Sequence, residues 1–216
     1  MTPMVPTSHE ALVENLRNAT TAEGLLAATA ALAQAPIAAT APVLVEVLGY
    51  NNPGAAVTAV DGLIRLGTAA VPALLELDPQ NYGARAWAVR ALAGIGDVRG
   101  LELLVEALGT DVAASVRRAA ARGLGNLALG RLDPAEQTSV QERCLEALLA
   151  ATSDGEWVVR YAVAVGLEGL ARGLRPQDRA MEQLRHGLVA LSKAAEGNPP
   201  VVCLRANLAL RRLDQQ

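Results

Sequence analysis

Apolar residues recur every three or four positions through most of the chain, the spacing that places them on one face of a helix. The alternation of β-branched and aromatic residues with period two that marks a strand does not occur. The pattern predicts three long helices, each following a shorter amphipathic one. The long helices are expected over Arg85–Gly96, Arg117–Ala128 and Arg160–Ala171, and the shorter ones over Ala69–Leu77, Val98–Leu108 and Val140–Thr152. We therefore expect an all-α fold.

The long segments align with one another when their first arginines are superposed. Leucine then stands at the eighth position of all three, as Leu92, Leu124 and Leu167. The intervals between the arginines are 32 and 43 residues, the second lengthened by an insertion near residues 129–139. Helix pairs at this spacing are typical of HEAT or armadillo α-solenoids. Weaker copies over Asn52–Gly67 and Asn198–Leu213 bring the expected total to about five helix pairs.

The predicted repeats fill most of the chain, so a single solenoid domain over residues 1–216 is expected. Residues 8–35 are expected to form N-terminal helices that cap the stack, and residues 36–213 to form the repeats. The longest uncharged stretch, Gly24–Val45, holds Pro36 and Pro42 and fits two buried helices better than a membrane span. No membrane insertion is expected.

Composition narrows the function classes. Hydrophobic residues make up 51% of the chain but aromatic ones only 2%, so the core must come from closely packed helices with small and aliphatic side chains. A net charge of −3 disfavours a nucleic-acid-binding surface. Two histidines and two cysteines, with no CxxC or HExxH motif, predict no metal site. The absence of a signal-peptide pattern and of a disulfide framework predicts a cytoplasmic protein.

An acidic residue precedes two of the aligned arginines by six positions: Asp111 before Arg117, and Asp154 before Arg160. HEAT stacks commonly hydrogen-bond such an aspartate in a turn to an arginine of the neighbouring repeat, and the forked guanidinium suits that contact. We assign Arg85, Arg117, Arg160, Asp111 and Asp154 to a structural ladder.

Arg90 and Arg122 share the sixth position of the alignment, 140° around the helix from the ladder position. They belong either to a solvated helix face or to an anion-binding surface along the stack. Trp87 lies closer to the apolar stripe and is expected in the core.

Two aromatic residues, Tyr82 and Trp157, each stand three positions before a ladder arginine, and Ala114 occupies that place in the repeat between them. Helix spacings predict that the two rings stand roughly 20 Å apart. Tyr161 follows Trp157 by one turn. The small Ala114 between the two rings would leave a trough, with arginines beside it. A trough of this kind suits a flat, elongated, anionic ligand. The plainer alternative is that the rings fill gaps near helix starts.

Three segments, "NYGARAWAVRALAGIGD", "SVRRAAARGLGNL" and "DGEWVVRYAVAVGLEGLA", resemble the F-type (beta) subunits of cyanobacterial phycobilin lyases, above all those that act on the phycocyanin alpha subunit. The likeness covers about Val43 to Leu213. It implies a heterodimer with an E-type HEAT subunit. This heterodimer would join a linear tetrapyrrole, phycocyanobilin, by a thioether to a cysteine of the phycocyanin alpha apoprotein. The bilin is a substrate, and no cofactor is expected.

The resemblance also implies roles for particular side chains. Arginines would pair with the bilin propionates and aromatic rings would stack on its pyrroles. A carboxylate, Asp154 or Glu156, would stabilise the protonated pyrroles. The bilin-binding set is then Arg90, Arg118, Arg122, Tyr82, Trp157 and Tyr161.

Related lyase-isomerases carry His and Cys side by side, a pair absent here, which favours plain attachment. Two competing interpretations are a non-catalytic HEAT scaffold or chaperone for phycobiliprotein assembly or disassembly, and a regulatory subunit that binds no bilin.

Overall fold

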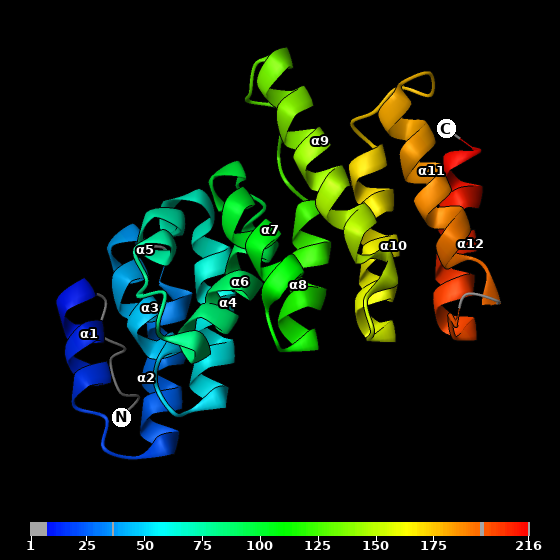
Figure 1. The fold of residues 1–216 in the computed structure, drawn as a ribbon. Helices are drawn as coiled ribbons and strands as arrows, with labels where there is room; N and C mark the ends of the chain where they lie inside the picture. The colour runs from blue at the N-terminus through cyan, green and yellow to red at the C-terminus, as the bar shows by residue number, and fades with distance from the viewer. Residues whose placement is uncertain (1–7, 36, 195–196, 216) are drawn as a thin grey trace. The chain divides into compact units, whose positions relative to one another are not determined.

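A computed structural model describes residues 8–35, 37–194 and 197–215, and the regular structure in these ranges is entirely helical (Figure 1). The predicted all-α, HEAT-type solenoid is confirmed. The chain divides into two compact units, Met1–Ile95 and Gly96–Gln216. The assignment of residues 1–216 to one domain stays a prediction.

The first unit contains α1 to α6. Helix α4 is central and packs against α2, α3 and α6. Two short 3-10 segments, η1 (Ala38–Thr40) and η2 (Gly67–Ala70), precede α3 and α5. Helix α5 is shorter than expected because the chain first makes the η2 turn. The helices are α1 (His9–Arg17), α2 (Ala22–Gln34), α3 (Ala41–Leu48), α4 (Pro53–Leu66), α5 (Val71–Leu75) and α6 (Tyr82–Ile95).

One stretch of this unit, Pro53–Leu75, is long and apolar enough to cross a membrane by length and composition alone. It is not one continuous helix, because Gly67 adopts a φ of 62° between α4 and the η2 turn. Some of its large apolar side chains, among them Leu63 and Leu74, are buried within the protein. These features fit core helices of a helical stack.

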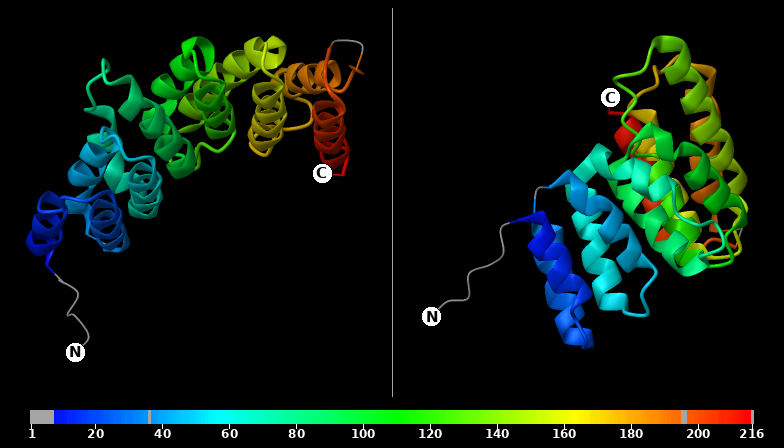
Figure 2. Two further views of the ribbon diagram at one scale, coloured as in Figure 1. Left: turned by 90° about the horizontal axis from the view of Figure 1, so that it is seen from below. Right: turned by 90° about the vertical axis from the view of Figure 1, so that its left-hand side faces the viewer.

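The second unit contains α7 to α12 in two layers. Helices α8, α10 and α12 pack side by side, and α7, α9 and α11 cover them (Figure 2). Two short 3-10 segments, η3 (Val98–Gly100) and η4 (Ala151–Ser153), adjoin α7 and α9. The helices are α7 (Leu101–Thr110), α8 (Ala114–Leu124), α9 (Pro134–Ala150), α10 (Trp157–Ala171), α11 (Arg179–Leu191) and α12 (Pro200–Leu213). From α3 to α12, the described residues make up the five pairs that the sequence predicts.

The insertion near residues 129–139 lengthens a helix. Helix α9 begins at Pro134, six residues before the predicted start at Val140. Asp133 caps it, accepting hydrogen bonds from the backbone N–H groups of Ala135 and Glu136, while the Glu136 side chain accepts one from the Asp133 N–H. This reciprocal cap, with proline in the first turn, accounts for the early start.

Leucine fills the core. The aligned residues Leu92, Leu124 and Leu167 are all fully buried. Trp87, expected in the core, is only half-buried. The core is thus thin and aliphatic, and the large ring stays at its edge.

Helices α8 and α10 approach each other with almost no side chain between them. A Cβ on Gly166 of α10 would lie 2.3 Å from the carbonyl oxygen of Ala121 in α8. One turn further along, Cβ atoms on Gly125 and Gly169 would likewise meet the facing backbone, at 2.3 Å. Glycine at these positions therefore lets the two backbones touch, and α8 and α10 are held in one fixed arrangement.

Candidate functional site

The ladder joins consecutive repeats in the second unit. Arg117 on α8 donates from Nε to Asp154 Oδ2 (2.7 Å) and from Nη2 to Asp154 Oδ1 (3.0 Å). Its Nη1 donates to the carbonyl oxygen of Asp111 (2.9 Å). The Asp154 side chain is 9% exposed and that of Arg117 16%. The hydrogen bond from Arg117 holds the pKa of Asp154 below its ordinary value. The structure thus brings these two predicted ladder residues together.

The next rung uses an amide instead of a carboxylate. Arg160 Nε donates to Asn198 Oδ1 (2.8 Å), and Arg160 Nη2 donates to the carbonyl oxygen of Gly197 (3.2 Å). Asn198 is buried, and its Nδ2 donates to the carbonyl oxygens of Ala190 and Lys193. Sequence reasoning missed Asn198 because it sought aspartate. Its place just before α12 matches that of Asp154 before α10.

The remaining two predicted ladder residues belong to different units. Arg85 is half-buried in the first unit, and Asp111 lies in the second, where its Oδ1 accepts a hydrogen bond from the backbone N–H of Ala113 (2.8 Å). The ladder roles of Arg85 and Asp111 stay predictions.

One face of α10 carries both predicted aromatic residues of the second unit. Trp157 is 46% exposed and Tyr161 is half-buried. Residues four apart are turned by only about 40°, so the two rings follow one another along the helix. The neighbouring α8 exposes Arg118 and Arg122, which also stand one turn apart. Aromatic and cationic side chains therefore occupy adjacent helices.

In the first unit, α6 presents Tyr82, 77% exposed, and a stacked pair. The Arg90 guanidinium lies over the Trp87 ring, 4.6 Å from its centroid. This cation–π contact explains why Trp87 stays at the surface and gives Arg90 a fixed position. Because Tyr82 and Trp157 belong to different units, the trough between them stays a prediction.

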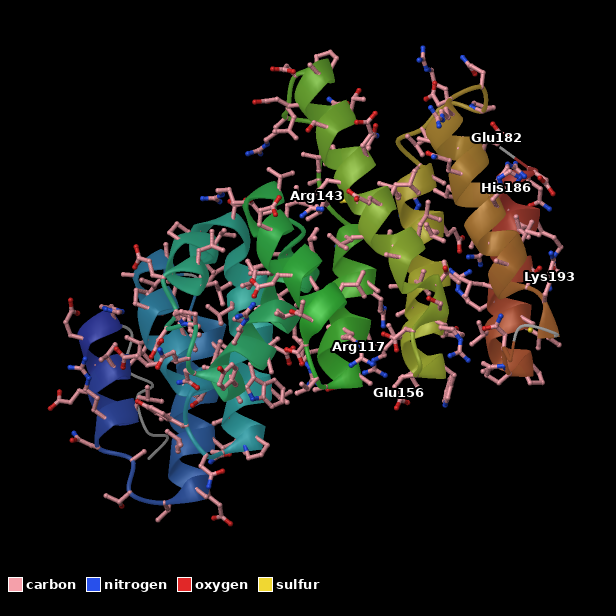
Figure 3. All side chains as sticks on the ribbon, in the orientation of Figure 1. Arg117, Arg143, Glu156, Glu182, His186 and Lys193 are labelled. Atoms are coloured by element: carbon pink, nitrogen blue, oxygen red, sulfur yellow. The ribbon has the colours of Figure 1, made fainter. Side chains whose placement is uncertain are left out.

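The two carboxylates predicted to face the bilin differ in availability. Both oxygens of Asp154 accept hydrogen bonds from Arg117, and Oδ1 accepts another from the Glu156 N–H (2.8 Å). Glu156 is exposed just before α10, where its side chain makes no capping hydrogen bond. Figure 3 shows Arg117 and Glu156 at the same end of α8 and α10. The geometry therefore favours the ladder role for Asp154 and leaves Glu156 as the free carboxylate of this pair.

A third carboxylate, Glu168, lies on the Trp157 and Tyr161 side of α10 and was not predicted. It is buried, and it accepts hydrogen bonds from Arg205 Nη2 and from Arg212 Nη1 (2.9 Å), both on α12. Burial alone would raise the pKa of Glu168, but these two hydrogen bonds outweigh it and hold the pKa below its ordinary value. The signal in the sequence was the spacing of seven between the two arginines, which places them on one face of α12.

Comparison with known proteins shows which family this chain is similar to. Residues 71–168 match the family of HEAT repeats. The bilin biosynthesis protein RpcF of Synechococcus sp. (strain WH8020) is 48% identical over 207 residues, which cover 94% of this chain and 95% of that protein. The phycocyanin alpha phycocyanobilin lyase CpcF of Synechocystis sp. (strain PCC 6803) is 52% identical over 164 residues, or 76% of this chain and 77% of that protein.

The chain belongs to the family of phycobilin lyase beta subunits. The second comparison is with a chain in the solved complex of CpcE and CpcF of the phycocyanin lyase of Nostoc sp. PCC7120. It is similar with a TM-score of 0.67 and 43% identity, and the match covers 80% of this chain and 98% of the solved one.

The cysteines of this beta subunit serve packing. Cys144 lies buried in α9, and burial raises the pKa of its thiol to about 12. Cys203 is half-buried, and its Sγ lies 3.6 Å from the carbonyl oxygen of Asn198, to which it donates. A thiol with so high a pKa holds its proton at neutral pH, so Cys144 is a poor nucleophile. Among the described residues, no three His, Cys, Asp or Glu side chains are grouped to hold a metal ion.

Proposed function

We propose that this chain is the beta subunit of a heterodimeric phycobilin lyase. With an E-type HEAT subunit, it attaches phycocyanobilin through a thioether to a cysteine of the phycocyanin alpha subunit. The observation that carries the proposal is the likeness to a chain of the solved complex of CpcE and CpcF, which covers 98% of that chain at 43% identity. The cyanobacterial cytosol, where antenna proteins are assembled, is the proposed location.

The attachment is an addition. The sulfur of the acceptor cysteine bonds to a carbon of the ring A ethylidene group, and a proton goes to the other end of that double bond. The acceptor provides the nucleophile, which agrees with the buried, protonated Cys144. The lyase contributes by holding pigment and acceptor in a reactive geometry, which can lower the barrier by several kcal/mol. The addition as written needs neither an oxidant nor a metal ion.

The proposed roles follow from placement. Trp157 and Tyr161 stack on pyrrole rings, and Arg118 and Arg122 on the neighbouring helix attract the propionates. On the first unit, Tyr82 and Arg90 are proposed to do the same. Glu156 is the proposed counter-ion of the protonated pyrroles. The bilin is substrate and not cofactor. Plain attachment, without isomerisation, is proposed.

The test is reconstitution from purified parts. This chain, an E-type subunit and phycocyanobilin are mixed with the phycocyanin alpha apoprotein, and covalent pigment is read as zinc-enhanced fluorescence on a denaturing gel. Pigment that appears only when both subunits are present supports the lyase. Unchanged attachment when this chain is omitted would leave it a scaffold or regulatory subunit.

Replacing Trp157 with alanine is expected to weaken phycocyanobilin binding by about fivefold, because a stacked ring contributes roughly 1 kcal/mol beyond the area it buries. The measurement is a pigment titration of the heterodimer followed by absorbance. The matched control is Val112→Ala, which truncates a side chain of the same unit that is 98% exposed. Equal affinity in the two variants would remove Trp157 from the site.

A further inference from the structure

The ion cluster between α10 and α12 carries more positive than negative charge. Glu168, Arg205 and Arg212 together have a net charge of +1. The Glu168 side chain is 9% exposed and that of Arg205 11%, whereas Arg212 keeps 55% of its side chain exposed. The Nη1 group of Arg205 is buried and has no hydrogen-bond partner among the described residues. Because this atom is shielded from solvent, a ligand from outside the chain meets the cluster at the exposed Arg212 instead.

Glu168 holds the guanidinium groups of Arg205 and Arg212 in place. Each of its oxygens accepts from a different arginine, so both arginines are fixed beside one carboxylate. The charge of the second arginine is left without a counter-ion at the cluster. A further carboxylate from outside the chain would supply that counter-ion, and guanidinium forks suit carboxylates.

Along α10 and α12, the side chains next to the cluster change from apolar at one end to charged at the other. On α10, Trp157, Tyr161 and Glu168 lie within about 40° of one another. On α12, Val201, Arg205 and Arg212 do the same. The helices run parallel, because Arg160 near the start of α10 binds Asn198 just before α12, while the Glu168 contacts lie further along both.

One end of this α10–α12 surface is therefore apolar and partly exposed, with Trp157 at 46% and Val201 at 43%. The other end is ionic. Tyr161 and Glu168 are seven residues apart, or about 10 Å along the helix. Two neighbouring pyrrole rings and the propionate arm of one of them span such a length.

We propose that Arg212, fixed by Glu168 beside Arg205, binds a propionate carboxylate of the tetrapyrrole whose rings lie on Trp157 and Tyr161. This inference rests on the proposed function and adds an anion-binding end to the pigment site. Arg212 is the residue in contact with the ligand. Glu168 acts through it as a positioning residue.

The experiment compares two pigments and two arginine variants. The heterodimer of this chain with its E-type partner is titrated with phycocyanobilin and with its dimethyl ester, which lacks both carboxylates. Arg212→Gln is compared with Arg211→Gln. The second variant removes an exposed arginine one residue earlier on α12, turned by about 100° away. Arg212→Lys, which keeps the charge, is the second variant should Arg212→Gln fail to fold.

The unmodified heterodimer is expected to prefer the acid over the ester. Arg212→Gln should weaken binding of the acid about tenfold and leave the ester unchanged, a difference of about 1.4 kcal/mol. Arg211→Gln should retain the preference, and Arg212→Lys should retain part of it. In the same way, Glu168→Gln should reduce the preference for the acid, because it frees Arg212 from its fixed position.

Three results would overturn the proposal. The unmodified heterodimer binds acid and ester equally, Arg212→Gln weakens both pigments alike, or Arg212→Gln weakens only association with the E-type subunit. In the last case the Arg212 guanidinium would pair with a carboxylate of the E-type subunit. The proposed function is tested separately by pigment attachment with the unmodified chain. If pigment attachment proceeds but the preference for the acid over the ester is the same in Arg212→Gln as in the unmodified chain, only the proposal of the anion-binding end is wrong.

Discussion

Replacing Gly166 with alanine is expected to destabilise the protein by roughly 3 kcal/mol, at the upper end of what overpacking a core costs. The added methyl group would lie 2.3 Å from the carbonyl oxygen of Ala121, and the clash is with backbone that cannot rotate away. Helices α8 and α10 must then separate. The unfolding midpoint should fall by about 9 °C, as measured by circular dichroism during heating.

The control uses the same substitution in an open helix. Gly109 lies within α7, and a Cβ there would have nothing within 4 Å. Gly109→Ala should therefore stabilise slightly, by about 0.5–1 kcal/mol, since alanine is the better helix former. If Gly166→Ala behaved like Gly109→Ala, the close approach of α8 and α10 would not exist in solution.

Replacing Arg117 with alanine is expected to cost roughly 2–3 kcal/mol, because it removes the two side-chain hydrogen bonds and the nearest cation from the partly buried Asp154 carboxylate. The measurement is urea unfolding at neutral pH. Arg118→Ala, one residue further along α8 at an exposed position, should change stability by less than about 0.5 kcal/mol. Similar losses in the two variants would show that Arg117 has no special role.

Acid should reduce the difference between the unmodified chain and Arg117→Ala. The pKa of Asp154 is lowered from an ordinary value of 3.8, chiefly by the hydrogen bond from Arg117. The folded protein thus binds this proton more weakly than the unfolded chain does. The stabilisation is complete above about pH 5 and is lost as the pH falls through the lowered pKa. At pH 3 the two proteins should differ less than at pH 7, and an unchanged difference would contradict the role of the ion pair.

The sequence predicted the structure correctly at positions where the repeat alignment and the chemistry of the side chain allow only one placement. Leucine at the eighth aligned position points to the core, and Arg117 with Asp154 forms the expected contact between repeats. The ladder could not be followed to Asn198, because an amide accepts the same hydrogen bond without the charge that identifies an aspartate.

The candidate site was less predictable because its features depend on partners across helices. Trp87 reads as a core residue until the guanidinium of Arg90 is seen over its ring. Glu168 stands in an apolar helix, and only the two arginines of α12 make its burial tolerable. The predicted relation between Tyr82 and Trp157 depends on two units and lies beyond what one repeat pattern determines.

The glycine contact between α8 and α10 has a consequence for how such a protein can diverge. At its closest point the joint is made of main chain, so that close approach does not depend on the exposed side chains of either helix. Arg118, Arg122, Trp157 and Tyr161 can therefore be exchanged without repacking the pair that carries them. A frame of this kind lets the exposed side chains of both helices change by substitution while the spacing of the helices is inherited unchanged.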